Sequence, residues 1–120
     1  MASVLVVDDD DNMRALIKTI LERRGHQVSV ARDGLEGLAS FEAGGQDLVV
    51  TDLVMPGIGG LAFFAELQRR QSPPKVLIVS GNKVRPDGDM SVLQASGRLA
   101  FMQKPFTPLE LAQSVQSLIG

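Results

Sequence analysis

Polar side chains that can bind metal ions or phosphoryl groups stand at the ends of four short apolar runs. They are two adjacent carboxylates, a third carboxylate, a hydroxyl and an ammonium group: Asp8 and Asp9, Asp52, Ser80 and Lys104. Carboxylates crowded into one pocket repel one another unless a cation binds or some are protonated. A hard divalent ion with oxygen ligands, such as Mg²⁺, relieves this repulsion. A carboxylate can also attack a phosphoryl group and form an aspartyl phosphate. The pattern predicts metal-assisted phosphoryl chemistry, provided that one fold gathers these side chains.

The apolar runs read as short strands that alternate with amphipathic helices. The runs are rich in β-branched residues, whereas the intervening segments carry apolar residues at helical spacing. Such alternation indicates βαβ units and a parallel sheet with helices on both faces. Strands are expected over residues 3–7, 27–31, 47–52, 75–79 and 99–103. Helices are expected over residues 12–24, 34–43, 61–70 and 108–119. A short fourth helix that does not begin before Asp87 or Asp89 is expected to end near Gly97.

These elements predict an α/β, doubly wound fold with a five-stranded parallel sheet and five helices. Right-handed crossovers leave few strand orders, and we predict the flavodoxin-like order 2-1-3-4-5. The carboxyl ends of strands one, three, four and five then meet at the switch point, where open α/β sheets bind ligands. There, Asp52 suits a nucleophile, Asp9 a metal ligand, Ser80 a hydrogen-bond donor and Lys104 a counter-charge for phosphoryl oxygens.

Four motifs carry a resemblance to a known family: Val-Asp-Asp at 7–9, Asp-Leu-Val-Met-Pro-Gly at 52–57, Ser-Gly at 80–81 and Lys-Pro-Phe at 104–106. Together they resemble the receiver domain of bacterial two-component response regulators, over essentially the whole chain. The resemblance implies that Asp52 accepts a phosphoryl group from a histidine kinase or a phosphotransfer protein. It also implies a Mg²⁺ site made by Asp8, Asp9, Asp52 and the backbone carbonyl of Val54.

The resemblance assigns roles to further residues. Ser80 and Lys104 would bind the phosphoryl group, and Ser80 and Phe101 would act as the conformational switch. Plain core packing of Phe101 is an equal alternative. The peptide bond before Pro105 is expected to be cis. Val54 and Asn82 occupy the two positions that tune phosphoryl lifetime in this family.

The partners implied are a histidine kinase or phosphotransfer protein and an output partner or domain that the sequence does not identify. Many receivers use the face formed by the fourth helix, fifth strand and fifth helix for partners or for a homodimer. Pro86 and Gly88 interrupt the approach to that face here.

Length and composition indicate the number of domains, the cellular compartment and whether nucleic-acid binding is expected. The chain has 120 residues, 44% of them apolar, and a net charge of −2, which predicts one receiver domain over residues 1–120. No run of residues has the length of a membrane span, no signal peptide is recognisable, and cysteine is absent, so we expect a cytoplasmic chain. Without a basic excess, direct nucleic-acid binding by this chain is not expected.

Helix termini show clear capping signals. Asp11 is expected to cap the first helix, and capping boxes are expected at 33–36 and 107–110, whereas Gly59 offers no side chain to the third helix. Of the neighbouring Phe63 and Phe64, one should lie in the core and the other half-covered.

Two other functions compete with the phosphoacceptor. One is a haloacid-dehalogenase-like phosphatase, because residues 8–10 offer an Asp-x-Asp motif after a strand, but this function leaves Asp52 without a role. The other is a protein-binding module with the receiver fold that is not regulated by phosphorylation. The single histidine, His26, is expected to pack at the surface in a turn, away from the site.

Overall fold

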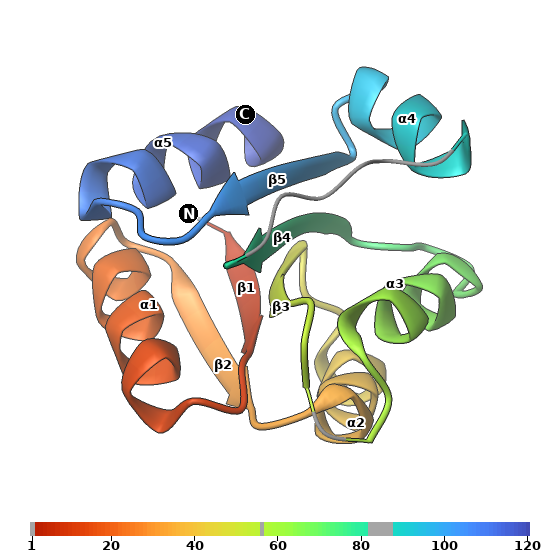
Figure 1. Cartoon of the computed structure of the whole chain (residues 1–120), viewed down its shortest axis with the longest axis horizontal. Coiled ribbons are helices and arrows are strands. Elements are labelled where there is room, and N and C mark those ends of the chain that lie inside the picture. Colours follow the sequence, from red (N-terminus) through yellow and green to blue (C-terminus); the bar gives the residue numbers. More distant parts are fainter. Residues whose placement is uncertain (1, 56, 82–87) are drawn as a thin grey trace.

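The computed structural model describes residues 2–55, 57–81 and 88–120, apart from the side chain of Asp89. Within these residues, strands and helices alternate along the whole chain (Figure 1). The strands are β1 (Ser3–Val7), β2 (Gln27–Ala31), β3 (Leu48–Asp52), β4 (Lys75–Ser80) and β5 (Leu99–Gln103). The helices are α1 (Asp11–Arg23), α2 (Gly34–Gly44), α3 (Gly60–Gln68), α4 (Gly88–Ala95) and α5 (Pro108–Ile119).

The strands form one parallel sheet in the order β2-β1-β3-β4-β5, which confirms the predicted topology. The central strands β1, β3 and β4 are buried along almost their whole length, whereas β2 lies at an edge and is largely exposed. Burial on both faces explains why the central strands are continuous apolar runs instead of alternating ones.

Two helical layers sandwich the sheet. Helices α1 and α5 lie on one face, where Ile17 and Leu21 of α1 and Leu111 of α5 pack against the strands. Helices α2 and α3 cover the other face with Phe41 and Phe63, and α4 adds to this layer beside the start of β5 (Figure 1). No described helix has both the length and the apolar character needed to cross a membrane.

The cap of α1 differs from the prediction. Asp10, not Asp11, is the N-cap: its backbone is extended, and its carboxylate accepts hydrogen bonds from the amides of Asn12 and Met13 at 2.9 and 3.2 Å. Asp11 is already helical and forms an ion pair with Arg14 instead. The chain leaves β1 early enough for the third of the four aspartates to reach the capping position.

The predicted boxes at the other helices are formed in part or in full. At α5, Thr107 and Glu110 make both bonds of the capping box. At α2, Asp33 accepts from the amide of Glu36, but the Glu36 carboxylate bonds the amide of Arg32 and not that of Asp33. The Glu36 side chain therefore reaches one residue further back than in a capping box. It also forms an ion pair with the Arg32 guanidinium.

Both phenylalanines of α3 are buried, so the prediction that one would be half-covered is wrong. Phe63 is 0% and Phe64 7% exposed. Phe63 faces the sheet, and Phe64 is covered because it shares a core cluster with Met90 of α4. Helix α2 also ends one residue later than expected, and α3 begins one residue earlier and ends two earlier. The turn at Pro56, the expected loop from Asn82 and the interruption at Pro86 lie outside the described residues.

Candidate functional site

Three carboxylates converge at the carboxyl ends of β1 and β3. Asp8 and Asp9 follow β1, and Asp52 is the last residue of β3, which neighbours β1 in the sheet. One carboxylate oxygen from each residue lies within 4.8 Å of the other two. Asp8 is buried, Asp52 is half-buried and Asp9 is exposed, so the cluster is open to solvent on one side. A donor set of carboxylate oxygens with an open side fits a hard divalent cation such as Mg²⁺.

Asp8 is held from two directions. Its Oδ1 accepts a hydrogen bond from the backbone amide of Asp10 at 2.9 Å, and its backbone carbonyl accepts one from the Arg14 guanidinium at 2.8 Å. Burial raises the pKa of the Asp8 carboxyl, and the charges of Asp52 and Asp9 add to this effect. The Asp10 amide and the Lys104 ammonium oppose it. A bound cation would lower the cost of keeping this carboxylate charged.

Lys104 supplies the positive charge at the site. Its Nζ lies 3.3 Å from Asp52 Oδ2 and 3.5 Å from Asp8 Oδ2. The residue follows β5, and its amide donates to the carbonyl of Ser80 at 2.8 Å, which ties it to the end of β4. The peptide bond between Lys104 and Pro105 is cis. The ammonium group therefore bridges the two carboxylates that come from different strands.

Asp52 has its second oxygen held by the backbone that follows it. Asp52 Oδ1 accepts from the amide of Leu53 at 2.7 Å, and the Leu53 carbonyl accepts from the amide of Gly60 at 2.8 Å. The first turn of α3 thus packs directly on the end of β3. A methyl group added at Gly60 would lie 2.6 Å from Leu53 Cα, so only glycine fits there without a shift of the backbone.

The remaining predicted residues lie at the end of β4, after β3 and on β5. Ser80 is buried at the end of β4, two strands from β1 in the sheet. Val54 follows Asp52 by two residues and is 67% exposed. Phe101 is half-buried on β5, beside Ile78 of β4, and packs against the core cluster on the α2 and α3 side of the sheet.

Sequence reasoning missed three contributors: the guanidinium of Arg14, the amide of Leu53 and the missing side chain of Gly60. Arg14 is 15% exposed and reaches back over the loop after β1. Its spacing of three from Asp11 could have indicated the ion pair, but nothing local indicates the bond to the Asp8 carbonyl. The two backbone contributions depend on how α3 meets β3, which a sequence pattern does not encode.

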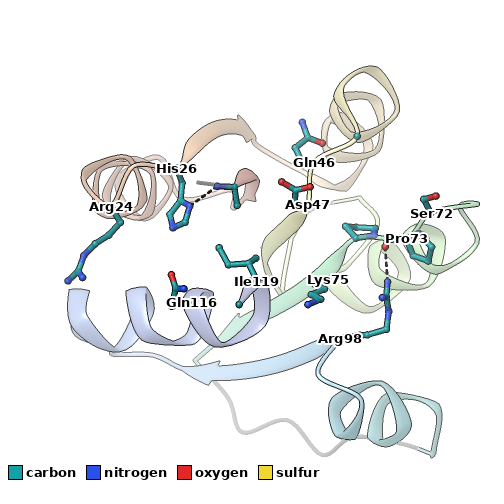
Figure 2. Close-up of a pocket in the computed structure, with 14 residues that line it drawn as sticks. Arg24, His26, Gln46, Asp47, Ser72, Pro73, Lys75, Arg98, Gln116 and Ile119 are labelled. Carbon is teal, nitrogen blue, oxygen red and sulfur yellow. Dashed lines mark hydrogen bonds between the residues drawn. The ribbon is translucent and has the colours of Figure 1, made fainter.

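A separate cavity of about 690 Å³ lies at the opposite end of the sheet, where the strands begin (Figure 2). Its lining includes His26 before β2, Asp47 before β3 and Arg98 before β5. The Nδ1 atom of His26 accepts from the amide of Ala2 at 3.2 Å, and the Arg98 guanidinium donates to the Pro73 carbonyl at 2.8 Å. None of the residues that form the carboxylate cluster lines this cavity, so the two regions are distinct.

Comparison with known proteins agrees with the fold and identifies a family. Residues 4–116 match the family model described as "Response regulator receiver domain". The chain is similar to the sensory transduction protein RegX3 of Mycolicibacterium smegmatis, with 29% identity over 99% of this chain and 51% of the relative. It therefore spans about half the length of this curated relative.

Solved structures of response regulators share this fold over nearly the whole chain. Chemotaxis response regulator CheY4 of Vibrio cholerae has a TM-score of 0.83 and 28% identity, covering 98% of each chain. Response regulator TrrA of Thermotoga maritima, solved in complex with Mg(2+)-BeF, has a TM-score of 0.81 and 32% identity, covering 98% of this chain and 99% of that one. The strand order and the carboxylate cluster define a doubly wound signalling domain. The chain belongs to the response regulator receiver domain family of two-component signal transduction.

Proposed function

We propose that the chain, over residues 1–120, is one receiver domain that works as a phosphoacceptor switch with Asp52 as the acceptor. The observation that carries this proposal is the position of Asp52 between the acidic pair and Lys104. Its Oδ2 lies 3.3 Å from the Lys104 ammonium, and its carboxylate shares a cluster with Asp8 and Asp9. The family match over residues 4–116 supports the assignment of the chain to a single domain.

The donor would be the phosphohistidine of a histidine kinase or phosphotransfer protein. An Asp52 carboxylate oxygen attacks the phosphorus atom, so that an oxygen–phosphorus bond forms as the nitrogen–phosphorus bond breaks. The electron pair of the broken bond stays on the imidazole nitrogen, which takes up a proton from water. Lys104 lies where it can pair with the transferred phosphoryl oxygens, and the buried Ser80 hydroxyl at the end of β4 is the proposed second partner.

Asp8, Asp9, Asp52 and the Val54 carbonyl would hold Mg²⁺. When bound, this ion would neutralise phosphoryl charge during transfer. The carboxylate cluster supports this set, and so does the presence of Mg(2+)-BeF in the solved TrrA structure. Val54 is exposed beside the acceptor, where its apolar side chain would affect the access of water to the aspartyl phosphate.

The proposed signal is a shift between two conformations. The phosphoryl group on Asp52 would draw the Ser80 hydroxyl toward it, and Phe101 would turn inward. The face made by α4, β5 and α5 would then change for an output partner, an output domain or a second copy of the chain. The kinase and the output remain to be identified by binding experiments.

The domain would act only on itself, without turning over a diffusible substrate. A dehalogenase-like phosphatase would use Asp10 as its second carboxylate, but Asp10 accepts two amide bonds as the cap of α1. That contact, together with the place of Asp52 in the cluster, favours the phosphoacceptor.

The test is phosphorylation of the purified chain by acetyl phosphate and Mg²⁺, followed by intact mass measurement. We expect a single phosphoryl addition to the wild-type protein and none to Asp52→Asn, because an amide oxygen is not nucleophilic enough to attack. Circular dichroism of Asp52→Asn should match the wild-type spectrum. Equal labelling of both proteins would refute Asp52 as the acceptor, and no labelling of either folded protein would favour the unregulated binding module.

A further inference from the structure

The described residues between β3 and α3, 53–55 and 57–59, are held against the body of the domain at Leu53 and at Ile58. At the start, Leu53 donates its amide to Asp52 and receives the amide of Gly60 on its carbonyl. Near the other end, Ile58 is half-buried and packs against the core cluster that contains Phe41 and Phe63. The segment carries Val54, the proposed source of the carbonyl for Mg²⁺.

Ile58 rests on the first residue of α2. A methyl group added at Gly34 would lie 2.7 Å from Ile58 Cδ1 and closer still to Cγ1, and 3.4 Å from the Ile58 carbonyl oxygen. Both the side chain and the backbone of Ile58 therefore lie against Gly34. Gly34 is not one of the described glycines with a positive φ, so its backbone conformation is open to other residues. It is the space, and not the backbone angle, that requires glycine here.

Contact with Ile58 is not easily relieved by rotation of the side chain. Isoleucine is β-branched and has few χ1 rotamers, and its neighbours in the core limit them further. A side chain at residue 34 would therefore move the segment away from α2. Gly60 follows Ile58 by two residues and donates its amide to the Leu53 carbonyl, and the Leu53 amide donates to the Asp52 carboxylate. Through these bonds, the displacement would reach both the Val54 carbonyl and Asp52.

We propose that Gly34 and Ile58 form a clamp that positions Leu53 and Val54 for Mg²⁺ binding, although neither Gly34 nor Ile58 touches the metal. This inference rests on the proposed function, because it assigns the clamp to the same site. It makes Gly34 the positioning residue: the space at Gly34 lets Ile58 lie against α2, and with it the segment that supplies the Val54 carbonyl and the Leu53 amide.

The decisive variant is Gly34→Ala, measured by NMR titration with MgCl₂. We expect Mg²⁺ affinity to fall about tenfold, the lower end of the range for residues that orient metal ligands. In Gly34→Ala/Ile58→Ala, the atoms that clash are removed, so most of the lost affinity should return. Ile58→Ala alone completes the cycle and gives the coupling between the two positions.

Gly37→Ala is the matched control. It places the same methyl group three residues along the same helix, 2.8 Å from Phe63 Cζ and 3.1 Å from Val7 Cγ2, and away from residues 53–59. We expect Gly37→Ala to lower the melting temperature without a change in Mg²⁺ affinity. A loss of affinity as large as that of Gly34→Ala would show that general destabilisation weakens the site, and would overturn the clamp.

Amide hydrogen exchange without metal supplies a readout that does not depend on the proposed function. In Gly34→Ala, the amides of Leu53 and Gly60 should exchange faster relative to the rest of the sheet than in Gly37→Ala. If wild-type protein bound no Mg²⁺, the proposed function would fail, but these exchange rates would still decide the clamp. Unchanged exchange at Leu53 and Gly60 overturns it, as does a loss of Mg²⁺ affinity that Ile58→Ala does not restore.

Discussion

Asp8 is the residue at which folding and metal binding make opposite demands. It is 1% exposed, and burial raises the pKa of its carboxyl while two other carboxylates lie in the same cluster. The folded protein therefore holds a proton on Asp8 more tightly than the unfolded chain does. The stability that this group contributes is present at low pH and is lost as the pH rises through the raised pKa. In the metal-free protein at neutral pH, a charged Asp8 is a cost that Lys104 offsets only in part.

Replacing Asp8 with asparagine should therefore stabilise the metal-free protein and weaken Mg²⁺ binding. The amide keeps the shape but cannot ionise, so the gain should be on the order of 1 kcal/mol, within the range for substitutions that improve the charge distribution. In a domain of this size that corresponds to a rise of roughly 4 °C in melting temperature. Thermal unfolding of both proteins, with and without MgCl₂, checks this. A melting temperature below that of wild type without metal would show that the Asp8 charge stabilises the fold.

At the scale of the elements, the helices differ in how their first turns are capped. The side chains of Asp10, Asp33 and Thr107 accept amide hydrogen bonds at the starts of α1, α2 and α5. At α3 the N-cap is Gly59, which offers no side-chain bond. Its φ of −73° and ψ of 171° are open to any residue, and an added methyl group would meet only the Leu53 carbonyl, at 3.7 Å.

Gly59→Ser should therefore stabilise the protein by about 1 kcal/mol. Part of this comes from a lower entropy of the unfolded chain and part from the new cap bond. Gly59→Ala separates the two contributions, because alanine supplies only the first. Urea unfolding of the three proteins should place Gly59→Ser above Gly59→Ala, and Gly59→Ala at or above wild type. Equal stability of the two variants would mean that the serine hydroxyl does not reach the α3 amides.

The same elements show what the sequence could predict. The bounds of β1, β2, β5 and α5 were predicted correctly, because alternation, helical spacing and the Thr107 capping box are local signals. The cap of α1 was misplaced because four consecutive aspartates can all act as caps, and only the path of the chain selects Asp10. The burial of Phe64 was missed because it depends on a core cluster that includes Met90 of α4, an element distant in sequence.

The same distinction between local signals and tertiary contacts holds for the candidate site. Asp8, Asp9 and Asp52 could be predicted to meet, because the carboxyl ends of parallel strands share one edge of the sheet. The contacts of Arg14 and Gly34 could not be predicted, because each depends on a loop docking against a helix that the sequence pattern does not relate to it.

At the scale of the whole molecule, the two ends of the sheet carry different groups of side chains. The carboxyl ends gather the acidic cluster, whereas the amino ends surround the cavity in Figure 2. There, His26 joins the turn after α1 to the start of β1, because its Nδ1 accepts the amide of Ala2. Burial lowers the pKa of the His26 imidazole, and the charged side chains of Arg24, Asp47 and Lys75 line the same cavity.

This arrangement predicts a pH dependence of stability that is separate from the phosphoacceptor site. The folded protein binds a proton at His26 less tightly than the unfolded chain, whose histidine has a pKa of about 6.5. The stability from neutral His26 is therefore present above that value and is lost as the pH falls through the lowered pKa, when Nδ1 can no longer accept the Ala2 amide.

Urea unfolding at pH 7 and pH 5 measures this loss when wild type is compared with His26→Gln. The contributions of all other titratable groups, including Asp8 with the opposite sign, are common to both proteins and cancel in the difference. We expect wild type to lose more stability than His26→Gln on acidification. Both should bind Mg²⁺ equally at pH 7, because His26 lies at the far end of the strands from Asp52. An equal loss of stability in the two proteins would mean that the His26 contact does not couple protonation to folding.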